Sequence, residues 1–378
     1  MRLSRTTQAR GGKRWALAAL LALGCGVGLI RAEGEPPSEP AGDGSTEGKP
    51  RVLFTGDALF RYEWVRDAPS PAIRDFERAR LRVRPGIEVR LGSGLVTLGA
   101  GLLGSLASDS NEDNEIRRDN FVSDEVTGDR AYARFAAPRS AFSATVGVAP
   151  SPFAGTEVLW DRDLRFHGAF AGGELPPGGH LVAQRLYGGL SLGSQREEDE
   201  SLTAAVRWEG EAPGGISLGA AFWHFDRTAE LIEAGLARTN RLTAAGDEYL
   251  SDFEIVNVTF GWEHLGERRP LRVRLDLLFN LGADDRRTGG DLRLDWGELQ
   301  APGTWRVRLT LQRIEQDAAL AAFGGDEWWF RTAQRGARVG FAVAVHRLAI
   351  IEVSALRQRR DTLDEWLDRV FADLVLRF

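Results

Sequence analysis

Arginine occupies most of the positions at which this sequence of 378 residues could recognise a charged ligand. All but two of the 48 basic residues are arginine, the exceptions being Lys13 and Lys49. One run has arginine at every second position, and its members are Arg78, Arg80, Arg82 and Arg84. In an extended strand these side chains share one face, about 7 Å apart. Because a guanidinium group can bind phosphate or carboxylate through two hydrogen bonds, a row of them in a narrow pore favours anions.

The other residue types give little support to catalysis. The one cysteine, Cys25, lies in an apolar N-terminal stretch, so the rest of the chain can form no disulfide, Cys-ligated zinc site or thiol nucleophile. The sequence has no G-x-S-x-G, H-E-x-x-H or P-loop motif. Of the five histidines, His224 lies two residues before Asp226, but no serine stands beside it. We therefore expect no catalytic residue, no metal site, no cofactor and no nucleic-acid partner.

The first 32 residues have the pattern of a cleaved secretory signal peptide. Basic residues precede the apolar run Trp15–Ile30, and Ala32 provides a small residue at its end. A membrane anchor and a lipid-attachment site at Cys25 are the alternatives. Residues 33–50 are rich in Gly, Pro, Ser and Glu, and they predict a flexible leader before a folded region at 51–378.

From Val52 to Phe378, apolar and polar residues alternate with a period of two, which indicates β-strands. Apolar residues occupy the odd positions of 271–279, for example, while arginine or aspartate occupies 272, 274 and 276. The alternation predicts sixteen strands, at 52–65, 76–91, 94–107, 129–137, 141–149, 164–172, 181–193, 201–209, 215–225, 253–264, 271–282, 290–299, 304–315, 336–346, 348–358 and 367–378.

The lengths of these strands and of their connections indicate a membrane barrel. Several strands reach about ten residues or more, whereas soluble sandwiches use strands of about 5–6 residues. Links after odd-numbered strands are mostly long, as at 108–128 and 226–252, and links after even-numbered strands are mostly short. This asymmetry is typical of outer-membrane proteins. We expect an all-β fold, a transmembrane antiparallel up-and-down β-barrel of about sixteen strands, with a large soluble barrel or jelly roll as the alternative.

The C-terminal strand supports a location in the bacterial outer membrane. Apolar residues alternate through it and end at Phe378, the last residue. A terminal aromatic residue on such a strand resembles the assembly signal that the barrel-assembly machinery reads. Five tryptophans near strand ends on the apolar face fit an interfacial girdle, namely Trp64, Trp208, Trp262, Trp296 and Trp305.

Several segments in order resemble the bacterial putative porin family over most of residues 76–378. They are the alternating run Arg78–Val83, the sequence Gly128-Asp129-Arg130-Ala131-Tyr132, the pair Pro150–Phe153 and Leu159–Leu164, and later segments at Asp252–Ile255 and Ala321–Asp326. The resemblance implies an outer-membrane barrel of about sixteen strands with a passive channel. It implies no particular solute.

With the apolar faces toward lipid, the polar faces line the lumen. The pore-lining arginines expected from this register are Arg78, Arg80, Arg82, Arg84, Arg130, Arg134, Arg272, Arg274, Arg306 and Arg308. Fewer acidic residues share these faces, among them Asp57, Glu63, Glu88, Asp276, Asp291 and Asp295. The arginines either select anions or pair with these carboxylates in a merely polar interior, and a register error of one residue would reverse a strand's faces.

Two acidic loops are candidates for further roles. Residues 150–163 carry Glu157, Asp161 and Asp163, and the loop either folds inward to narrow the channel or remains an ordinary external loop. The loop at 108–128 is acidic enough to bridge divalent cations to lipopolysaccharide, although a solvated loop without a specific ligand is the preferred interpretation.

The sequence thus predicts a porin that passes small hydrophilic solutes by passive diffusion, with a lean toward anions. Its expected partners are outer-membrane lipid and lipopolysaccharide, the barrel-assembly machinery and the solutes themselves. A homotrimer is suggested by analogy with porins and by no feature of the sequence. The alternatives are a structural or adhesive barrel without an open pore and a hydrolase barrel, although residues 33–50 are too short to form a folded plug.

Overall fold

The computed structural model describes residues 50–66, 75–92, 94–108, 126–136, 141–153, 157–193, 200–233, 236–237, 239–266 and 269–378. The expected signal peptide, the leader up to residue 49 and most of the acidic loop at 108–128 lie outside these residues. No helix among the described residues is long and apolar enough to span a membrane.

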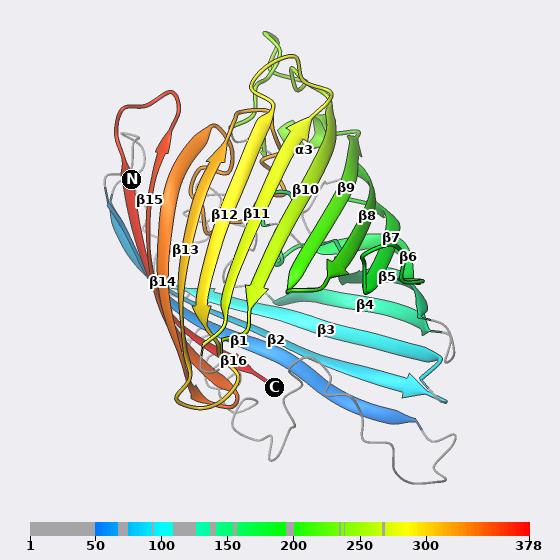
Figure 1. Cartoon of the computed structure of the whole chain (residues 1–378). Helices are drawn as coiled ribbons and strands as arrows, with labels where there is room; N and C mark the ends of the chain where they lie inside the picture. The colour runs from blue at the N-terminus through cyan, green and yellow to red at the C-terminus, as the bar shows by residue number, and fades with distance from the viewer. Residues whose placement is uncertain are drawn as a thin grey trace, which may run out of the picture.

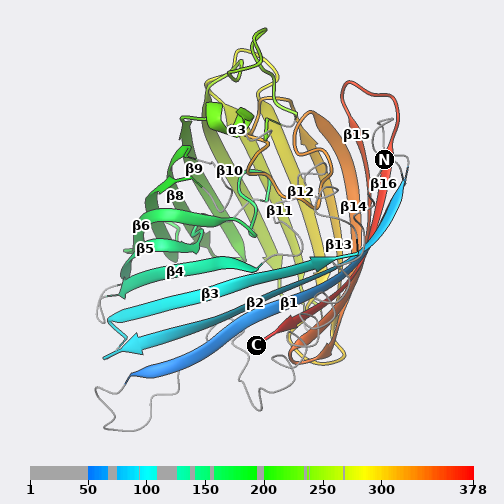
Figure 2. The ribbon, with the colours of Figure 1, turned by 180° about the vertical axis from the view of Figure 1, so that it is seen from behind.

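Sixteen antiparallel strands form one closed barrel, in which each strand pairs with its neighbours in sequence and β1 pairs with β16 (Figures 1 and 2). A short helix, α3 (Ala229–Glu233), follows β9. The strands are β1 (Arg51–Arg66), β2 (Phe76–Leu91), β3 (Val96–Ala107), β4 (Val126–Ala136), β5 (Phe142–Pro150), β6 (Arg165–Leu175), β7 (Ala183–Leu192), β8 (Leu202–Ala212), β9 (Ile216–Asp226), β10 (Phe253–His264), β11 (Leu271–Asn280), β12 (Thr288–Gly297), β13 (Trp305–Ile314), β14 (Gln334–His346), β15 (Ala349–Arg360) and β16 (Leu367–Arg377). The expected fold and strand count are confirmed, and the strand ends differ from the expected ones by a few residues.

The alternation of residue types explains the two faces of the barrel wall. On β1, the outward side chains include Phe54 and Phe60, which are 61% and 46% exposed. The inward residues Arg61 and Glu63 are buried and stand directly opposite Arg80 and Arg78 of β2. Large apolar residues are exposed around the outside, as a wall in contact with lipid requires.

The interior holds an apolar core, which the polar-inside pattern of the strands does not anticipate. Two connections fold into the barrel from its long-loop end. We call residues 151–153 and 157–164, between β5 and β6, the first inward loop, and residues 315–333, between β13 and β14, the second inward loop. Trp160 of the first stacks on Phe323 of the second, with ring centroids 5.0 Å apart, and both pack near Trp223 and Phe225 of β9.

Backbone and side-chain hydrogen bonds join the loops into one body. Asp161 N–H donates to the carbonyl of Phe323 at 2.7 Å, which joins the two inward loops. The amide of Asn240, in the connection between β9 and β10, donates to the carbonyls of Gln316 and Ala319, and its oxygen accepts from Ala321 N–H. One buried asparagine therefore fixes the second inward loop to the loop above it.

The two ends of the chain's barrel region meet where β1 and β16 close the wall. Gly56 and Phe378 exchange two backbone hydrogen bonds, of 2.6 and 3.0 Å. The Phe378 ring lies so close to the Cα of Gly56 that a Cβ at this position would collide with it. Closure therefore uses a glycine opposite the terminal aromatic residue.

Candidate functional site

A cavity of about 960 Å³ lies inside the barrel and reaches from the short-turn end to the first inward loop. Its walls come from β1 and β2 on one side, from β12 to β15 on the other, and from the end of β16. The residues that line it include twelve arginines and six carboxylates, so its interior carries an excess of positive charge. We call it the arginine cavity.

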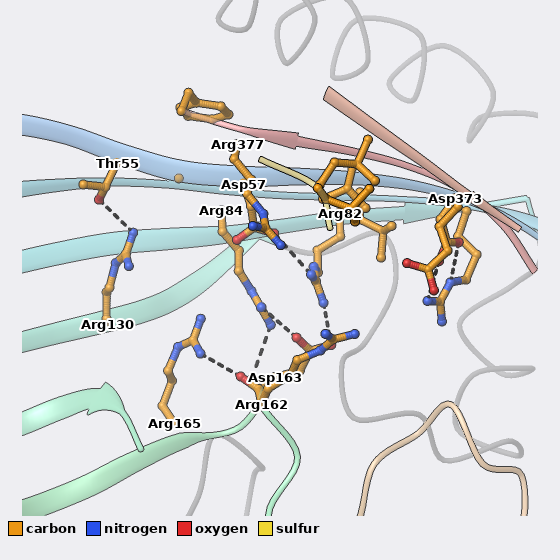
Figure 3. A pocket seen from close by; sticks show the side chains of 18 of the residues that line it. Thr55, Asp57, Arg82, Arg84, Arg130, Arg162, Asp163, Arg165, Asp373 and Arg377 are labelled. Atoms are coloured by element: carbon orange, nitrogen blue, oxygen red, sulfur yellow. Dashed lines mark hydrogen bonds and ion pairs between the residues drawn. The ribbon is translucent and has the colours of Figure 1, made fainter. Parts of the chain in front are cut away.

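At its inner end, the cavity meets ion pairs between the first inward loop and the wall (Figure 3). Arg84 Nη1 donates to Asp163 Oδ1 at 2.8 Å, and Arg82 donates to the other oxygen of the same carboxylate. Burial alone would raise the pKa of Asp163, but the charges of Arg82 and Arg84 outweigh it and hold the pKa well below its usual range. The Asp163 carboxylate is therefore a permanent charge that ties the loop to β2.

The second inward loop joins this contact through Glu327. Arg162 Nη2 donates to Glu327 Oε1 at 2.8 Å, which links the two loops by an ion pair. Arg369 of β16 donates to the backbone carbonyls of Asp326 and Glu327, at 2.8 and 3.0 Å, and pairs with Glu63 at 2.8 Å. Beyond these contacts the described residues leave a void of about 20 Å³, the size of one water molecule. The loops thus constrict the lumen at this level.

Three arginines surround Asp129, a carboxylate with no exposed surface. A shift of register between β3 and β4 passes over Asp129 in the strand pairing, so that Asp129 enters the lumen together with Arg130. Arg165 lies 2.8 Å from Asp129, and Arg84 and Arg130 lie at 3.5 and 3.7 Å. Arg130 also donates to Thr55 at 3.2 Å. Its side chain passes over Gly86 and Gly101, and a Cβ atom at either glycine would collide with it.

The opposite wall carries a second group of arginines. Arg308 makes a two-pronged contact with Asp295, at 2.6 and 3.2 Å. Arg306 has only long contacts, 3.7 Å to Asp295 and 3.5 Å to Glu352, and its Nε is buried without an acceptor among the described residues. The charge of Arg306 is therefore only weakly compensated by these carboxylates.

The structure places the expected site residues in three environments. Five of the ten expected pore-lining arginines line the arginine cavity, namely Arg82, Arg84, Arg130, Arg306 and Arg308. Arg78 and Arg80 also face inward, but they are buried beside Glu63. The remaining three, Arg134, Arg272 and Arg274, do not line the cavity.

The acidic residues of the first inward loop also differ in role. Glu157 and Asp163 line the cavity, and Glu157 lies 3.3 Å from Arg293. Asp161 was expected beside them, but it is buried and instead accepts hydrogen bonds from the N–H groups of Asp163 and Asp326. Burial, together with the nearby charges of Asp163, Asp326 and Glu327, raises the pKa of Asp161 well above its usual value.

Sequence reasoning missed the second inward loop. It treated residues 316–335 as an ordinary long connection and required a folded N-terminal segment for any plug, whereas two loops already fill much of the lumen. One signal was present in β9, where Phe222 faces outward and Trp223 and Phe225 face inward. A strand with large apolar residues on both faces needs an apolar partner inside the barrel. His224 points outward on this strand, 3.7 Å from Glu254.

Comparisons with known proteins agree with this architecture. Residues 66–188 match the family model described as putative porin. Among solved structures, the OmpF porin of Salmonella typhi in complex with daunomycin is similar, with a TM-score of 0.52, 11% identity and coverage of 86% of this chain and 97% of that chain. Two mutants of the Rh. blastica porin reach a TM-score of 0.50 at 12% and 13% identity, and each match covers 87% of this chain and 100% of that chain.

At these identities the solved structures show the fold. A comparison with curated proteins found no match. The family match covers β2 to β6, ends inside β7, and contains the arginine run, Asp129 and the first inward loop. Together, the closed barrel of sixteen strands and this match show that the chain is a porin-like β-barrel of a bacterial outer membrane, similar over residues 66–188 to the putative porins.

Proposed function

We propose that the protein is a channel for the passive diffusion of small hydrophilic solutes and that it favours anions. The observation that carries this proposal is the composition of the arginine cavity, with twelve arginines against six carboxylates. A pore lined by fixed positive charges lowers the free energy of an entering anion and raises that of a cation. The signal peptide at 1–32, the leader at 33–50, delivery by the barrel-assembly machinery and assembly as a homotrimer are parts of the same proposal.

Solutes would cross the constriction where the inward loops meet β1 and β2. The void of about 20 Å³ beyond the loops lies among Leu59, Arg61, Arg80, Arg82, Arg162, Asp163, Asp326 and Glu327. All of these side chains except Leu59 are charged, so the path past the loops is mostly polar although the interior core beside it is apolar. Passage of a solute larger than water requires the loops to move away from the wall.

Recording from single channels in a planar bilayer under a salt gradient tests this function. We expect ohmic steps with a reversal potential biased toward anions. Arg306→Gln should reduce that bias, because Arg306 lines the cavity and its charge is poorly compensated. Arg269→Gln is the matched control, since Arg269 lies outside the cavity over the rings of Trp296 and Trp305. A cation bias in the wild-type protein would overturn the anion preference.

A barrel without an open pore is the second candidate, and the apolar core formed by the inward loops favours it. The same recordings separate the two functions. Absence of conductance from protein that is folded, as shown by the mobility shift of unheated samples on gels, would contradict the channel and support the plugged barrel. A hydrolase is a third alternative, which an assay of the folded protein with ester and phospholipid substrates tests directly.

A further inference from the structure

Three arginines stand side by side on the outside of the barrel at its extracellular end. Arg313 of β13 is directly opposite Arg335 of β14, and Arg335 is directly opposite Arg359 of β15. Like charges in directly opposite positions destabilise a sheet. We call this set the arginine row. A bound anion would relieve the repulsion between its three positive charges.

The glutamines adjacent in sequence to these arginines indicate that the row faces outward. Each arginine directly follows a glutamine that is buried toward the lumen, namely Gln312, Gln334 and Gln358. Because side chains alternate along a strand, the arginines point away from the lumen. Arg313 and Arg335 are exposed, whereas Arg359 is partly covered and its Nε is buried without an acceptor among the described residues.

An apolar groove of about 560 Å³ lies against the row on the outer surface. Leu275, Leu292 and Leu311, from β11, β12 and β13, form its apolar part. Arg313, Arg335 and Arg357 line the same groove, with Trp366 beside them. The guanidinium carbons of Arg357 and Arg359 each lie 5.5 Å from the centre of the Trp366 ring. The outer groove thus combines an apolar floor with a cationic rim.

The carboxylates near this rim leave most of its charge uncompensated. Asp368 lies 3.6 Å from Arg357, and Asp364 lies 4.0 Å from Arg359. Both pairs are long, and Asp364 is fully exposed, which makes such a contact worth little. In the part of the chain that the structure describes, no carboxylate pairs with Arg313 or Arg335.

We propose that the arginine row and the outer groove bind one phosphorylated lipid of the outer leaflet. The phosphate would lie on Arg313, Arg335 and Arg359, since arginine binds phosphate through two parallel hydrogen bonds. An acyl chain would lie along Leu275, Leu292 and Leu311, toward the middle of the membrane. This arrangement places charge at the level of the headgroups and apolar surface below it. The proposal requires an outer-membrane barrel but does not depend on whether the lumen conducts.

Titration of the full-length folded protein with lipid A in detergent, followed by native mass spectrometry, tests the site. The probes are lipid A with two phosphates, the same lipid after enzymatic removal of both, and inorganic phosphate. We expect the phosphorylated lipid to bind at least about tenfold more tightly than the dephosphorylated one. The double variant Arg335→Gln with Arg359→Gln should abolish this difference. Arg286→Gln, at the same end but outside the groove, should preserve it.

A second variant separates a lipid from a free anion. Leu311→Trp fills the apolar groove without changing any charge, so it should weaken binding of lipid A and leave any binding of inorganic phosphate unchanged. Equal affinity of both lipids for the wild-type protein would overturn the proposal, as would unchanged binding in the double arginine variant. Binding of inorganic phosphate alone would assign the row to a soluble anion and also overturn it. The mobility shift of unheated samples establishes that each variant is folded.

Discussion

Asp163, near the end of the first inward loop, accepts a hydrogen bond of 2.8 Å from Arg84 on the barrel wall, 79 residues earlier in the sequence. The pair lies at the inner end of the arginine cavity, where it both narrows the lumen and neutralises a wall arginine. These two effects act on different observables. Narrowing lowers the conductance, whereas neutralisation lowers the preference for anions.

Asp163→Asn should therefore raise both the conductance and the anion bias of the channel. Among the described residues, Asp163 is the only carboxylate that contacts both Arg82 and Arg84. The substitution therefore removes one negative charge from the wall, although Asp57 still lies 3.2 Å from Arg82 and Asp129 lies 3.5 Å from Arg84. Reversal potentials and unitary conductance under a salt gradient measure the two effects. Asp364→Asn, on a fully exposed aspartate outside the cavity, is the control and should change neither. An unchanged reversal potential in Asp163→Asn would show that ions do not pass this pair.

Trp160→Ala should destabilise the inward loops. Trp160 is 1% exposed and stacks on Phe323 and Trp223, so its removal leaves a cavity in the interior core. Loss of a buried tryptophan costs about 3–5 kcal/mol. We expect a lower free energy of unfolding in urea together with larger and noisier conductance steps. Trp262→Ala, on the outward face of β10, should leave the conductance at its wild-type value. A stable variant with wild-type conductance would indicate that the core does not hold the loops in place.

The pH response of the constriction should depend on Asp161. Burial, with the neighbouring carboxylates Asp163, Asp326 and Glu327, raises the pKa of Asp161 well above its value in the unfolded chain. The stability this group contributes is complete below the unfolded pKa and is lost as the pH rises through the folded pKa. Asp163 has the opposite sign, because its lowered pKa keeps it charged until the pH falls well below 3.8. A range of pH therefore exists in which Asp161 is protonated while Asp163 stays charged and keeps its contact with the wall.

The expected result is a conductance that is lower below the folded pKa of Asp161 than above it, since loss of the Asp161 charge removes repulsion between the two loops. Asp161→Asn mimics the protonated state and should show the lower conductance throughout. Recordings over a series of pH values provide the measurement. If the variant kept the wild-type pH response, another group would be responsible.

The strands could be predicted from the sequence because lipid and lumen impose opposite requirements on alternate residues. In β2, charged residues such as Arg78 and Arg80 could only face inward. Because polar residues occupy every second position, they fix the register of this strand. The second inward loop could not be predicted in this way. Its packing depends on contacts between Phe323, Trp160 and β9, which are distant in sequence and follow no period. The inward position of Asp129 could not be predicted for a related reason, because a local shift of register moves this residue off the alternating pattern.

Phe378 connects a sequence signal to a structural role, and the two can be separated. Its backbone pairs with Gly56 and its ring covers that glycine, so the residue helps to close the barrel between β1 and β16. Phe378→Ala keeps the backbone pairing and removes the ring. If the ring is chiefly a signal for the assembly machinery, the variant should refold normally in detergent yet reach the outer membrane several-fold less in cells. Phe378→Trp is the control, because it keeps an aromatic residue at this position, whereas a Cβ at Gly56 would also collide with the backbone carbonyl of Arg84. Normal assembly of Phe378→Trp with poor assembly of Phe378→Ala is the expected pattern, whereas a loss of refolding in Phe378→Ala would assign Phe378 to closure of the barrel.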